Sequence, residues 1–248
     1  MLEISHLGKS FGGLHALSDF SVVVRAGEIL GLIGPNGSGK TTAINVLTGI
    51  YPASKGGFAL SGQDLTAAKS EKIARAGIAR TFQNLRLFSS QSVLDNVRTG
   101  QTIHCRSPLS RFSAFASTEE KQLRCEALAL IERFGLGERV NWPAGSLSYG
   151  EKKRLEIARA LAMRPKVLLL DEPAAGMNPV ELEWLMAAIR EIGQSGIAVI
   201  LVEHHMRLIM RVCDNLAVLN FGVKIAEGPP SDIARHPEVI AAYLGVAH

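Results

Sequence analysis

The sequence has few cysteines and lacks the features of a secretory leader. Its three cysteines, Cys105, Cys125 and Cys213, are widely spaced and form no CxxC pattern. A disulfide framework or a zinc site is therefore not expected, and this cysteine usage favours a reducing cytoplasm. The N-terminus carries an acid and lacks the basic start and apolar centre of a signal peptide. We expect no secretory processing.

Long apolar runs and dense charge are also missing. The longest apolar runs, Val167 to Leu170 and Ile197 to Val202, have the length of strands, whereas a helix that crosses a bilayer needs about 20 apolar residues. The 248 residues carry a net charge of +4, but the basic residues are spread out, without a Lys/Arg block or interleaved aromatic residues. This distribution argues against a nucleic-acid partner. It is compatible with a protein that acts next to an anionic membrane surface.

Residues 34–41 read Gly-Pro-Asn-Gly-Ser-Gly-Lys-Thr, which matches the phosphate-loop pattern. A strand is expected before it at 28–33 and a helix after it at 42–48, which is the context that this motif requires. Lys40 is expected to reach the β- and γ-phosphates and Thr41 to ligate Mg²⁺, while a glycine-rich turn without a ligand is the structural alternative. The residues expected to bind the nucleoside triphosphate are Gly34, Pro35, Asn36, Gly37, Ser38, Gly39, Lys40, Thr41 and Thr42.

Two acids follow the apolar run Val167 to Leu170. A buried parallel strand would deliver Asp171 to the carboxyl edge of its sheet, where the phosphate loop also lies. Asp171 could hold Mg²⁺ there, partly through water, and Glu172 could act as general base on the water that attacks the γ-phosphate. Paired acids after a strand are also common as a turn or helix cap, but the phosphate loop favours the catalytic interpretation.

The order of predicted elements indicates an α/β fold. Antiparallel strands are expected near the N-terminus, a helical block with a loop at 101–117 in the middle, and strands alternating with helices in the last third. Asn178 and Pro179 are typical of a helix start. The strands are predicted at 2–6, 19–24, 28–33, 57–60, 78–82, 167–170, 197–202, 216–219 and 223–227, and the helices at 42–48, 67–76, 92–99, 118–134, 150–163, after Asn178 and from His205.

The segment Leu147-Ser-Tyr-Gly-Glu151 lies at a predicted helix start. Ser148 suits an N-cap and the helix start could bind an anion, although an ordinary capped helix explains the same residues. Together with the phosphate loop and the acids, this segment resembles the signature of the ATP-binding-cassette (ABC) ATPases, and residues 34–41 and 167–171 resemble their Walker A and Walker B motifs. The resemblance covers essentially the whole chain. It implies a P-loop NTPase (RecA-like) core with an N-terminal antiparallel β subdomain and an inserted helical subdomain.

The resemblance also implies a domain organisation and further roles. Residues 1–248 would form one nucleotide-binding domain, with an ATP-binding core at about 1–85 and 164–248 and a helical signature subdomain at about 86–163. Gln83 matches the glutamine that touches Mg²⁺ or the attacking water, and His204 matches the switch histidine that contacts the γ-phosphate. Phe11 lies where an aromatic ring stacks on adenine. Without the family, these three residues would be a solvated amide, a structural histidine and a core phenylalanine.

In this family two ATPase subunits meet head to tail, and the signature of one closes over the ATP of the other. Ser148, Tyr149, Gly150 and Glu151 would serve the opposing subunit in this way, so that an isolated monomer binds ATP but hydrolyses it poorly. Tyr149 replaces the usual glycine of the signature. Asn178 replaces the usual aspartate of the D-loop, which removes a negative charge and affects the coupling expected across the dimer.

Several segments resemble the branched-chain amino-acid importer group, namely 80–88, 147–151, 172–179 and 242–245. The implied partners are a second ABC ATPase, two transmembrane permeases and, indirectly, an extracytoplasmic substrate-binding protein. The chain would lie peripherally on the cytoplasmic side of the inner membrane. Residues 84–96, with Leu85, Leu87 and Phe88, would face the permeases, or else pack within the subdomain. The alternatives are the motor of a lipid or lipopolysaccharide exporter and, less favoured, a soluble ABC protein acting on nucleic acid or ribosomes.

Overall fold

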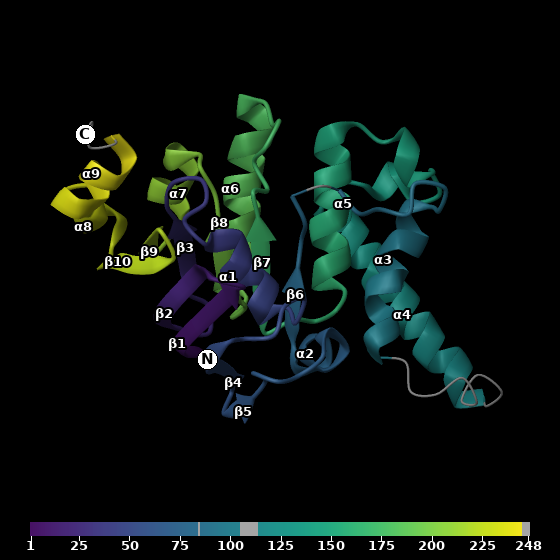
Figure 1. Ribbon diagram of the computed structural model, residues 1–248. Coiled ribbons are helices and arrows are strands. Elements are labelled where there is room, and N and C mark those ends of the chain that lie inside the picture. Colours follow the sequence, from purple (N-terminus) through teal and green to yellow (C-terminus); the bar gives the residue numbers. More distant parts are fainter. Residues whose placement is uncertain (84, 105–113, 245–248) are drawn as a thin grey trace. The chain divides into compact units, whose positions relative to one another are not determined.

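A computed structural model of the chain describes residues 1–83, 85–104 and 114–244. These residues divide into two compact units, one of residues 1–80 with 166–248 and one of residues 81–165. Figure 1 labels their helices and strands. Of the residues named above, Asn84, Cys105 and Gly245 lie outside the described part. Among the described helices, none combines the length and the apolar character that a bilayer crossing requires.

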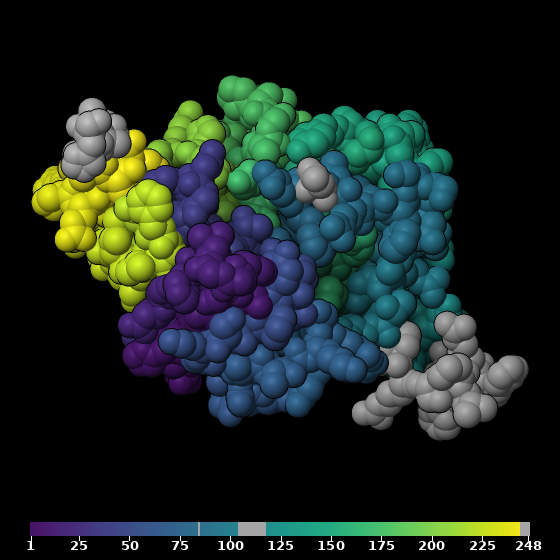
Figure 2. Space-filling model, viewed as in Figure 1, coloured from purple at the N-terminus to yellow at the C-terminus, as the bar shows by residue number. Residues whose placement is uncertain are grey.

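The first unit begins with an antiparallel sheet whose strand order is β2-β1-β4-β5. The predicted strands at 2–6 and 19–24 are too short, because the chain forms a long hairpin that turns at Gly12 and Gly13. Irregular pairing between Ile4 and Ser10 breaks the alternation that marks a strand in the sequence. These strands reach the face of the molecule shown in Figure 2 (purple). The sheet comprises β1 (Leu2–Phe11), β2 (Leu14–Val24), β4 (Lys55–Leu60) and β5 (Gln63–Asp64).

The second sheet of this unit has the order β10-β9-β3-β8-β7-β6. Its strands pair in parallel except for β10, which is antiparallel to β9. The central strands β3, β7 and β8 are buried along their whole length, as their continuous apolar runs predicted. The sheet comprises β3 (Ile29–Ile33), β6 (Ile78–Arg80), β7 (Val167–Asp171), β8 (Ala198–Val202), β9 (Asn215–Asn220) and β10 (Val223–Gly228).

The helices of this unit lie between or after its strands in the sequence. The helix after the phosphate loop begins at Lys40, earlier than predicted. Asn178 caps α6 through bonds to the N–H groups of Val180 and Glu181, as its position before Pro179 predicted. Helices α8 and α9 were missed in the sequence. The helices are α1 (Lys40–Leu47), α2 (Ser70–Ala76), α6 (Pro179–Gln194), α7 (Met206–Val212), α8 (Pro230–Ile233) and α9 (Pro237–Leu244).

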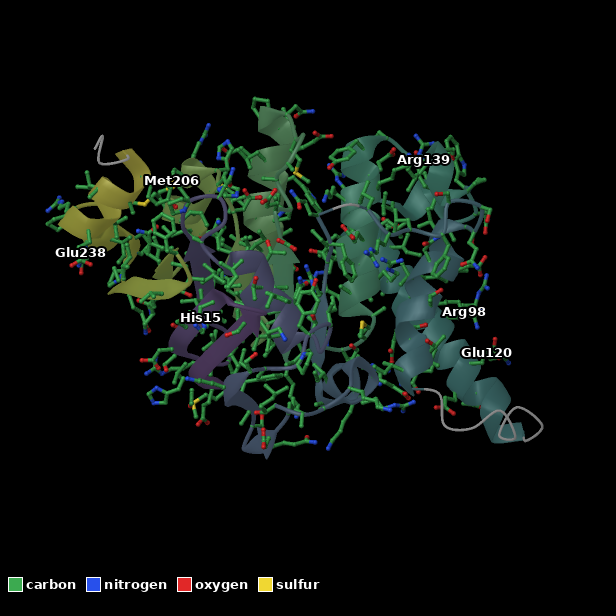
Figure 3. All side chains as sticks on the ribbon, viewed as in Figure 1. His15, Arg98, Glu120, Arg139, Met206 and Glu238 are labelled. Carbon is green, nitrogen blue, oxygen red and sulfur yellow. The ribbon has the colours of Figure 1, made fainter. Side chains whose placement is uncertain are left out.

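The unit of residues 81–165 is helical. Ser92 caps its first helix by accepting a hydrogen bond from the Asp95 N–H. An ion pair of 2.7 Å between Arg98 and Glu120 joins α3 to α4 (Figure 3). The elements are α3 (Val93–Gln101), η1 (Thr102–His104), α4 (Ala114–Arg133), η3 (Gly137–Arg139), η4 (Ala144–Ser146) and α5 (Tyr149–Leu161).

The loop predicted at 101–117 is wrong at both ends. Gln101 ends α3, a 3₁₀ turn follows at 102–104, and α4 already begins at Ala114. The helix predicted at 67–76 starts only at Ser70, and its end at Gly77, which has a φ of 113°, is confirmed. Apart from these boundaries, the α/β class and the mainly parallel core are as predicted.

Candidate functional site

The phosphate loop, residues 34–42, joins β3 to α1. Gly39 has a φ of 106°, and a Cβ there would lie 2.6 Å from the carbonyl oxygen of Ala16. Gly34 has a φ of 148°, and its Cβ would lie 2.0 Å from the Leu219 carbonyl oxygen. Only glycine combines these backbone angles with such close neighbours. Gly34 and Gly39, both predicted from the motif, are therefore required by the fold itself.

Lys40 closes the loop on itself. Its ammonium donates hydrogen bonds to the carbonyl oxygens of Gly34 and Pro35, both at 2.8 Å. Burial lowers the pKa of Lys40, and the negative charges of Glu172 and Asp171 oppose this shift. A cation held by neutral carbonyls and close to two acids is available to an incoming phosphate, which would supply stronger, charged acceptors.

Asp171 ends β7 and is buried. Its carboxylate forms an ion pair of 2.7 Å with Arg80 at the end of β6, and both side chains are at most 8% exposed. The same guanidinium donates to the Asn45 side chain of α1 at 2.6 Å. The structure thus holds Asp171 in a defined orientation against the helix that follows the phosphate loop. No individual role was expected for Arg80 or Asn45 from the sequence.

Glu172 turns sharply out of β7. It has a φ of 47°, an unusual value for a residue other than glycine and typical of strained functional positions. Its N–H donates to the carbonyl of Val202, the last residue of β8. Its carboxylate oxygen Oε1 lies 3.1 Å from Nε2 of His204. The structure therefore brings together the two residues proposed from the sequence as base and switch, both of them partly exposed to solvent.

The residues of this edge fit a nucleotide with its divalent cation. Asn36 and Gly37 are exposed, and a Cβ built at Gly37 would meet no atom within 4 Å. Thr41 lies in the first turn of α1 and is exposed, and the edge also carries the acid Asp171. Exposed backbone at a helix start suits an anion, and hydroxyl and carboxylate oxygens suit Mg²⁺. The donor set is the one expected for a nucleoside triphosphate with Mg²⁺.

Phe11 is not a core residue, so the alternative interpretation of it as a core phenylalanine is wrong. It ends β1 and is 41% exposed. Its ring packs edge-on against Tyr51, with the ring centroids 5.1 Å apart, and the Lys9 ammonium lies 5.0 Å from its centroid. An exposed aromatic pair of this kind can stack on a base. The adenine-stacking role of Phe11 stays a prediction, and Tyr51 is the neighbour that sequence reasoning missed.

Gln83 and the signature residues belong to the helical unit. The residue Gln83 is exposed, and its backbone carbonyl oxygen accepts a hydrogen bond from the side chain of the buried Lys153 of α5 at 3.4 Å. Ser148 is the N-cap of α5, as predicted, in a reciprocal capping box with Glu151. Tyr149 occupies the first position of the helix and is 43% exposed, whereas Gly150 is buried. The ligand roles of these residues stay predictions.

Two further side chains, to which the sequence analysis assigned no individual role, approach the core site. Tyr243 in α9 forms a hydrogen bond with the backbone of Gly34; burial raises the pKa of its phenol, and this bond acts in the opposite direction. Glu203 follows β8 and is 4% exposed, and it accepts three backbone hydrogen bonds. The sequence signal that could have identified Glu203 is a polar residue at the end of a predicted buried strand.

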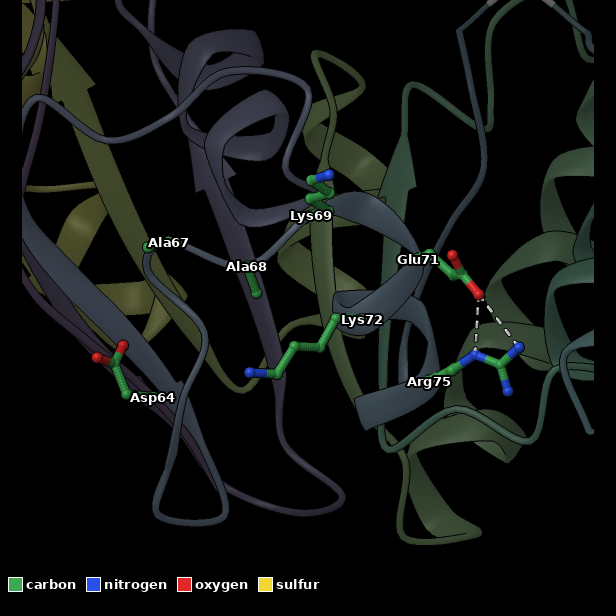
Figure 4. Close-up of a pocket in the computed structure, with 7 residues that line it drawn as sticks. All are labelled: Asp64, Ala67, Ala68, Lys69, Glu71, Lys72 and Arg75. Carbon is green, nitrogen blue, oxygen red and sulfur yellow. Dashed lines mark hydrogen bonds and ion pairs between the residues drawn. The ribbon is translucent and has the colours of Figure 1, made fainter.

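A shallow pocket of the first unit lies apart from these residues. Figure 4 shows its lining, which contains no residue of the phosphate loop and neither Asp171, Glu172 nor His204. Arg75 there pairs with Glu71, and the Asp64 carboxylate accepts a hydrogen bond from the Thr66 N–H. Solvated charges that are already paired or hydrogen-bonded account for this surface. It is lined by Asp64, Ala67, Ala68, Lys69, Glu71, Lys72 and Arg75.

Comparison with known proteins identifies the family of the chain. The family model described as "ABC transporter" matches residues 17–175, and the model described as "Branched-chain amino acid ATP-binding cassette transporter" matches residues 223–248. The chain is 41% identical to the high-affinity branched-chain amino acid transport ATP-binding protein BraF of Pseudomonas aeruginosa and 40% identical to LivG of Escherichia coli. Each alignment covers 100% of this chain and 98% of the relative.

Solved structures agree with this assignment. A nucleotide-free ATP-binding cassette from an ABC transporter superposes with a TM-score of 0.87 at 32% identity, over 99% of both chains. The ADP conformation of an ATP-binding cassette gives a TM-score of 0.86 at 32% identity, over 99% of this chain and 98% of that chain. The phosphate loop, the paired acids and the fold therefore have the same explanation: the chain belongs to the ABC transporter family, as one of its nucleotide-binding ATPase domains.

Proposed function

We propose that the chain is the ATP-hydrolysing subunit of an importer for branched-chain amino acids. The observation that carries the substrate class is the similarity over the full length to BraF and LivG, whose names give that transport activity. The match of residues 223–248 to a branched-chain transporter model supports it, because this segment lies outside the matched ATPase region. No residue of an ATPase subunit needs to touch the solute, so the substrate class rests on the relatives rather than on the site.

The site geometry supports distinct roles for individual residues of the ATP-binding core. The residues of the phosphate loop hold the phosphates, with Lys40 at the β- and γ-phosphates. Mg²⁺ would be held by Thr41 and Asp171, partly through water, and it would neutralise charge on the phosphates. Glu172 accepts the proton of the attacking water. His204, at 3.1 Å from Glu172, is placed to share that carboxylate and to contact the γ-phosphate.

A second ABC ATPase subunit completes the site in this proposal. The exposed start of α5, with Ser148 and Tyr149, would bind the ATP of the opposing subunit in a head-to-tail dimer. Asn178 is committed to capping α6, through two backbone N–H bonds at 3.0 Å. This commitment explains how the D-loop keeps its shape without the usual aspartate. The second subunit is a paralogue or a second copy of this chain.

The remaining partners follow from the transport role. Two transmembrane permeases would hold the chain at the cytoplasmic side of the inner membrane, and an extracytoplasmic protein would deliver the solute. Phe88 is 48% exposed, and Leu85 and Leu87 are half-buried, so this segment offers apolar surface for a permease. The proposal includes no nucleic-acid partner, because the basic residues form no dense cluster in the sequence.

The variant Lys40→Ala should weaken ATP binding by about 10- to 100-fold, since hydrogen bonds to a charged group contribute about 1.5–3 kcal/mol. Titration of a fluorescent ATP analogue measures this effect. Lys69→Ala is the matched control, because Lys69 is an exposed lysine that lines the pocket of Figure 4. Unchanged affinity in Lys40→Ala, with the melting temperature also unchanged, would count against the assignment of the phosphate loop.

Affinity purification of the tagged chain from its native membranes tests the transport proposal. We expect two different multi-span permeases and a second cassette ATPase to co-purify, after which branched-chain amino acids are the first solutes to assay. If the chain instead co-purifies with the membrane proteins of a lipid or lipopolysaccharide exporter, the proposed substrate class is wrong, but the chain is still the ATPase subunit of a transporter. Recovery only in the soluble fraction, with nucleic acid or ribosomes, would reject transport.

A further inference from the structure

Glu203 is a buried acid to which the proposed mechanism gives no role. It directly follows β8 and is 4% exposed. None of the ion pairs found among the described residues includes Glu203. A buried carboxylate requires compensation for its lost hydration, so the source of that compensation indicates what the side chain does.

Backbone N–H groups supply the compensation. The oxygen Oε1 of Glu203 accepts a hydrogen bond of 2.6 Å from the Ala174 N–H. The other oxygen, Oε2, accepts from the N–H groups of His204 at 3.0 Å and His205 at 3.3 Å. Hydrogen bonds from N–H groups to a charged acceptor are stronger than bonds between neutral groups. One side chain therefore ties three points of the backbone together.

These three points lie in the two loops that carry the catalytic pair. Ala174 is two residues after Glu172, in the loop that follows β7, and His204 and His205 lie in the loop that follows β8. The contact of 3.1 Å between Glu172 and His204 crosses the same two loops. A displacement of one loop relative to the other would change that contact directly.

We propose that Glu203 is a positioning residue for ATP hydrolysis, whose carboxylate fixes the loop of Glu172 against the loop of His204. The inference rests on the proposed roles of Glu172 and His204. Glu203 does not itself reach the reacting atoms, because it is buried and both its oxygens are bound to backbone. An apolar side chain of similar size would fill the space but would leave three backbone N–H groups, including the buried one of Ala174, without this acceptor.

The variant Glu203→Gln tests the proposal with little change of volume. Its amide group would present a donor where a backbone N–H also donates, so at least one of the two loops must shift. We expect kcat for ATP to fall about 10- to 100-fold, as for a small displacement of catalytic groups. The ATP dissociation constant should change by less than about twofold, because the phosphate loop is untouched. Both are measured on the purified full chain, at concentrations where the rate per subunit no longer rises.

A second readout does not depend on hydrolysis. The ring resonances of His204, assigned in the NMR spectrum by comparison with His204→Gln, should move in Glu203→Gln because the contact with Glu172 changes. Glu203→Asp keeps the charge on a shorter side chain and should give an intermediate kcat. Glu183→Gln is the matched control, since Glu183 is an exposed acid that pairs with Arg207 and Arg211 between α6 and α7. It should resemble the unmodified chain in both measurements.

The outcomes separate this inference from the proposed function. An unmoved His204 resonance in Glu203→Gln overturns the positioning role, whether or not kcat falls. Normal kcat in Glu203→Gln with turnover abolished in Glu172→Gln also overturns it and leaves the catalytic assignment intact. Normal turnover in Glu172→Gln removes the proposed base itself. If Glu203→Gln does not fold, the kcat and the His204 resonance of Glu203→Asp decide by the same criteria.

Discussion

Replacing Glu172 by glutamine is expected to reduce ATP turnover by about 10²- to 10⁴-fold, the range associated with loss of a general base. Glutamine has nearly the same size and can still accept a hydrogen bond from His204, whose Nε2 lies 3.1 Å from the Glu172 carboxylate. It cannot take the proton of the attacking water. The variant should therefore bind ATP normally and accumulate as an ATP-bound dimer. The measurements are kcat, the ATP dissociation constant and the oligomeric state with and without ATP.

Glu183→Gln serves as the control for this variant as well, because it removes an exposed carboxylate that pairs only with arginines in the described contacts. It should leave turnover within about twofold of the unmodified chain. Normal hydrolysis by Glu172→Gln would refute the base assignment. Loss of hydrolysis together with loss of ATP binding would indicate a distorted phosphate loop instead, because Glu172 also acts electrostatically on Lys40.

The sheet edge that carries Asp171, Glu172 and His204 could be located from the sequence because its signals are local. The strand before the phosphate loop and the strand before Asp171 are continuous apolar runs, and both are buried throughout. Parallel pairing then brings their carboxyl ends to one edge. The close contact of Glu172 and His204 follows from this edge, since β7 and β8 are neighbours. The chemical roles of these residues came from the family pattern, because an acid or a histidine after a strand has several ordinary explanations.

The contacts that hold the edge in place could not be predicted in the same way. Arg80 and Asp171 are 91 residues apart, and Glu203 and Ala174 are 29 apart. The sequence shows that a residue is charged, but it does not show which distant residue its side chain will contact. The long N-terminal hairpin was missed for a related reason, since irregular pairing after Ile4 disrupts the alternation of apolar residues. Each of these features depends on tertiary pairing, which the local sequence pattern does not show.

Arg80→Met should destabilise the chain by about 3–5 kcal/mol, the usual effect of removing one partner from a buried ion pair. The Asp171 carboxylate is only 5% exposed and would lose the guanidinium at 2.7 Å. For a chain of this size the loss corresponds to a fall in melting temperature of about 6–20 °C. Thermal unfolding in the absence of nucleotide and Mg²⁺ measures it. Methionine keeps much of the length of the arginine side chain, so packing changes little.

The double variant Arg80→Met with Asp171→Asn tells a charge effect from a packing effect. With both charges removed, neither an isolated carboxylate nor an isolated guanidinium is left in the buried site. The double variant should therefore be more stable than the sum of the two single effects predicts, by a coupling of about 1–3 kcal/mol. Strictly additive losses would mean that Arg80 acts through packing and through Asn45, which it contacts at 2.6 Å. A measured coupling would instead identify the ion pair with Arg80 as a contact that holds Asp171 in its orientation before nucleotide binds.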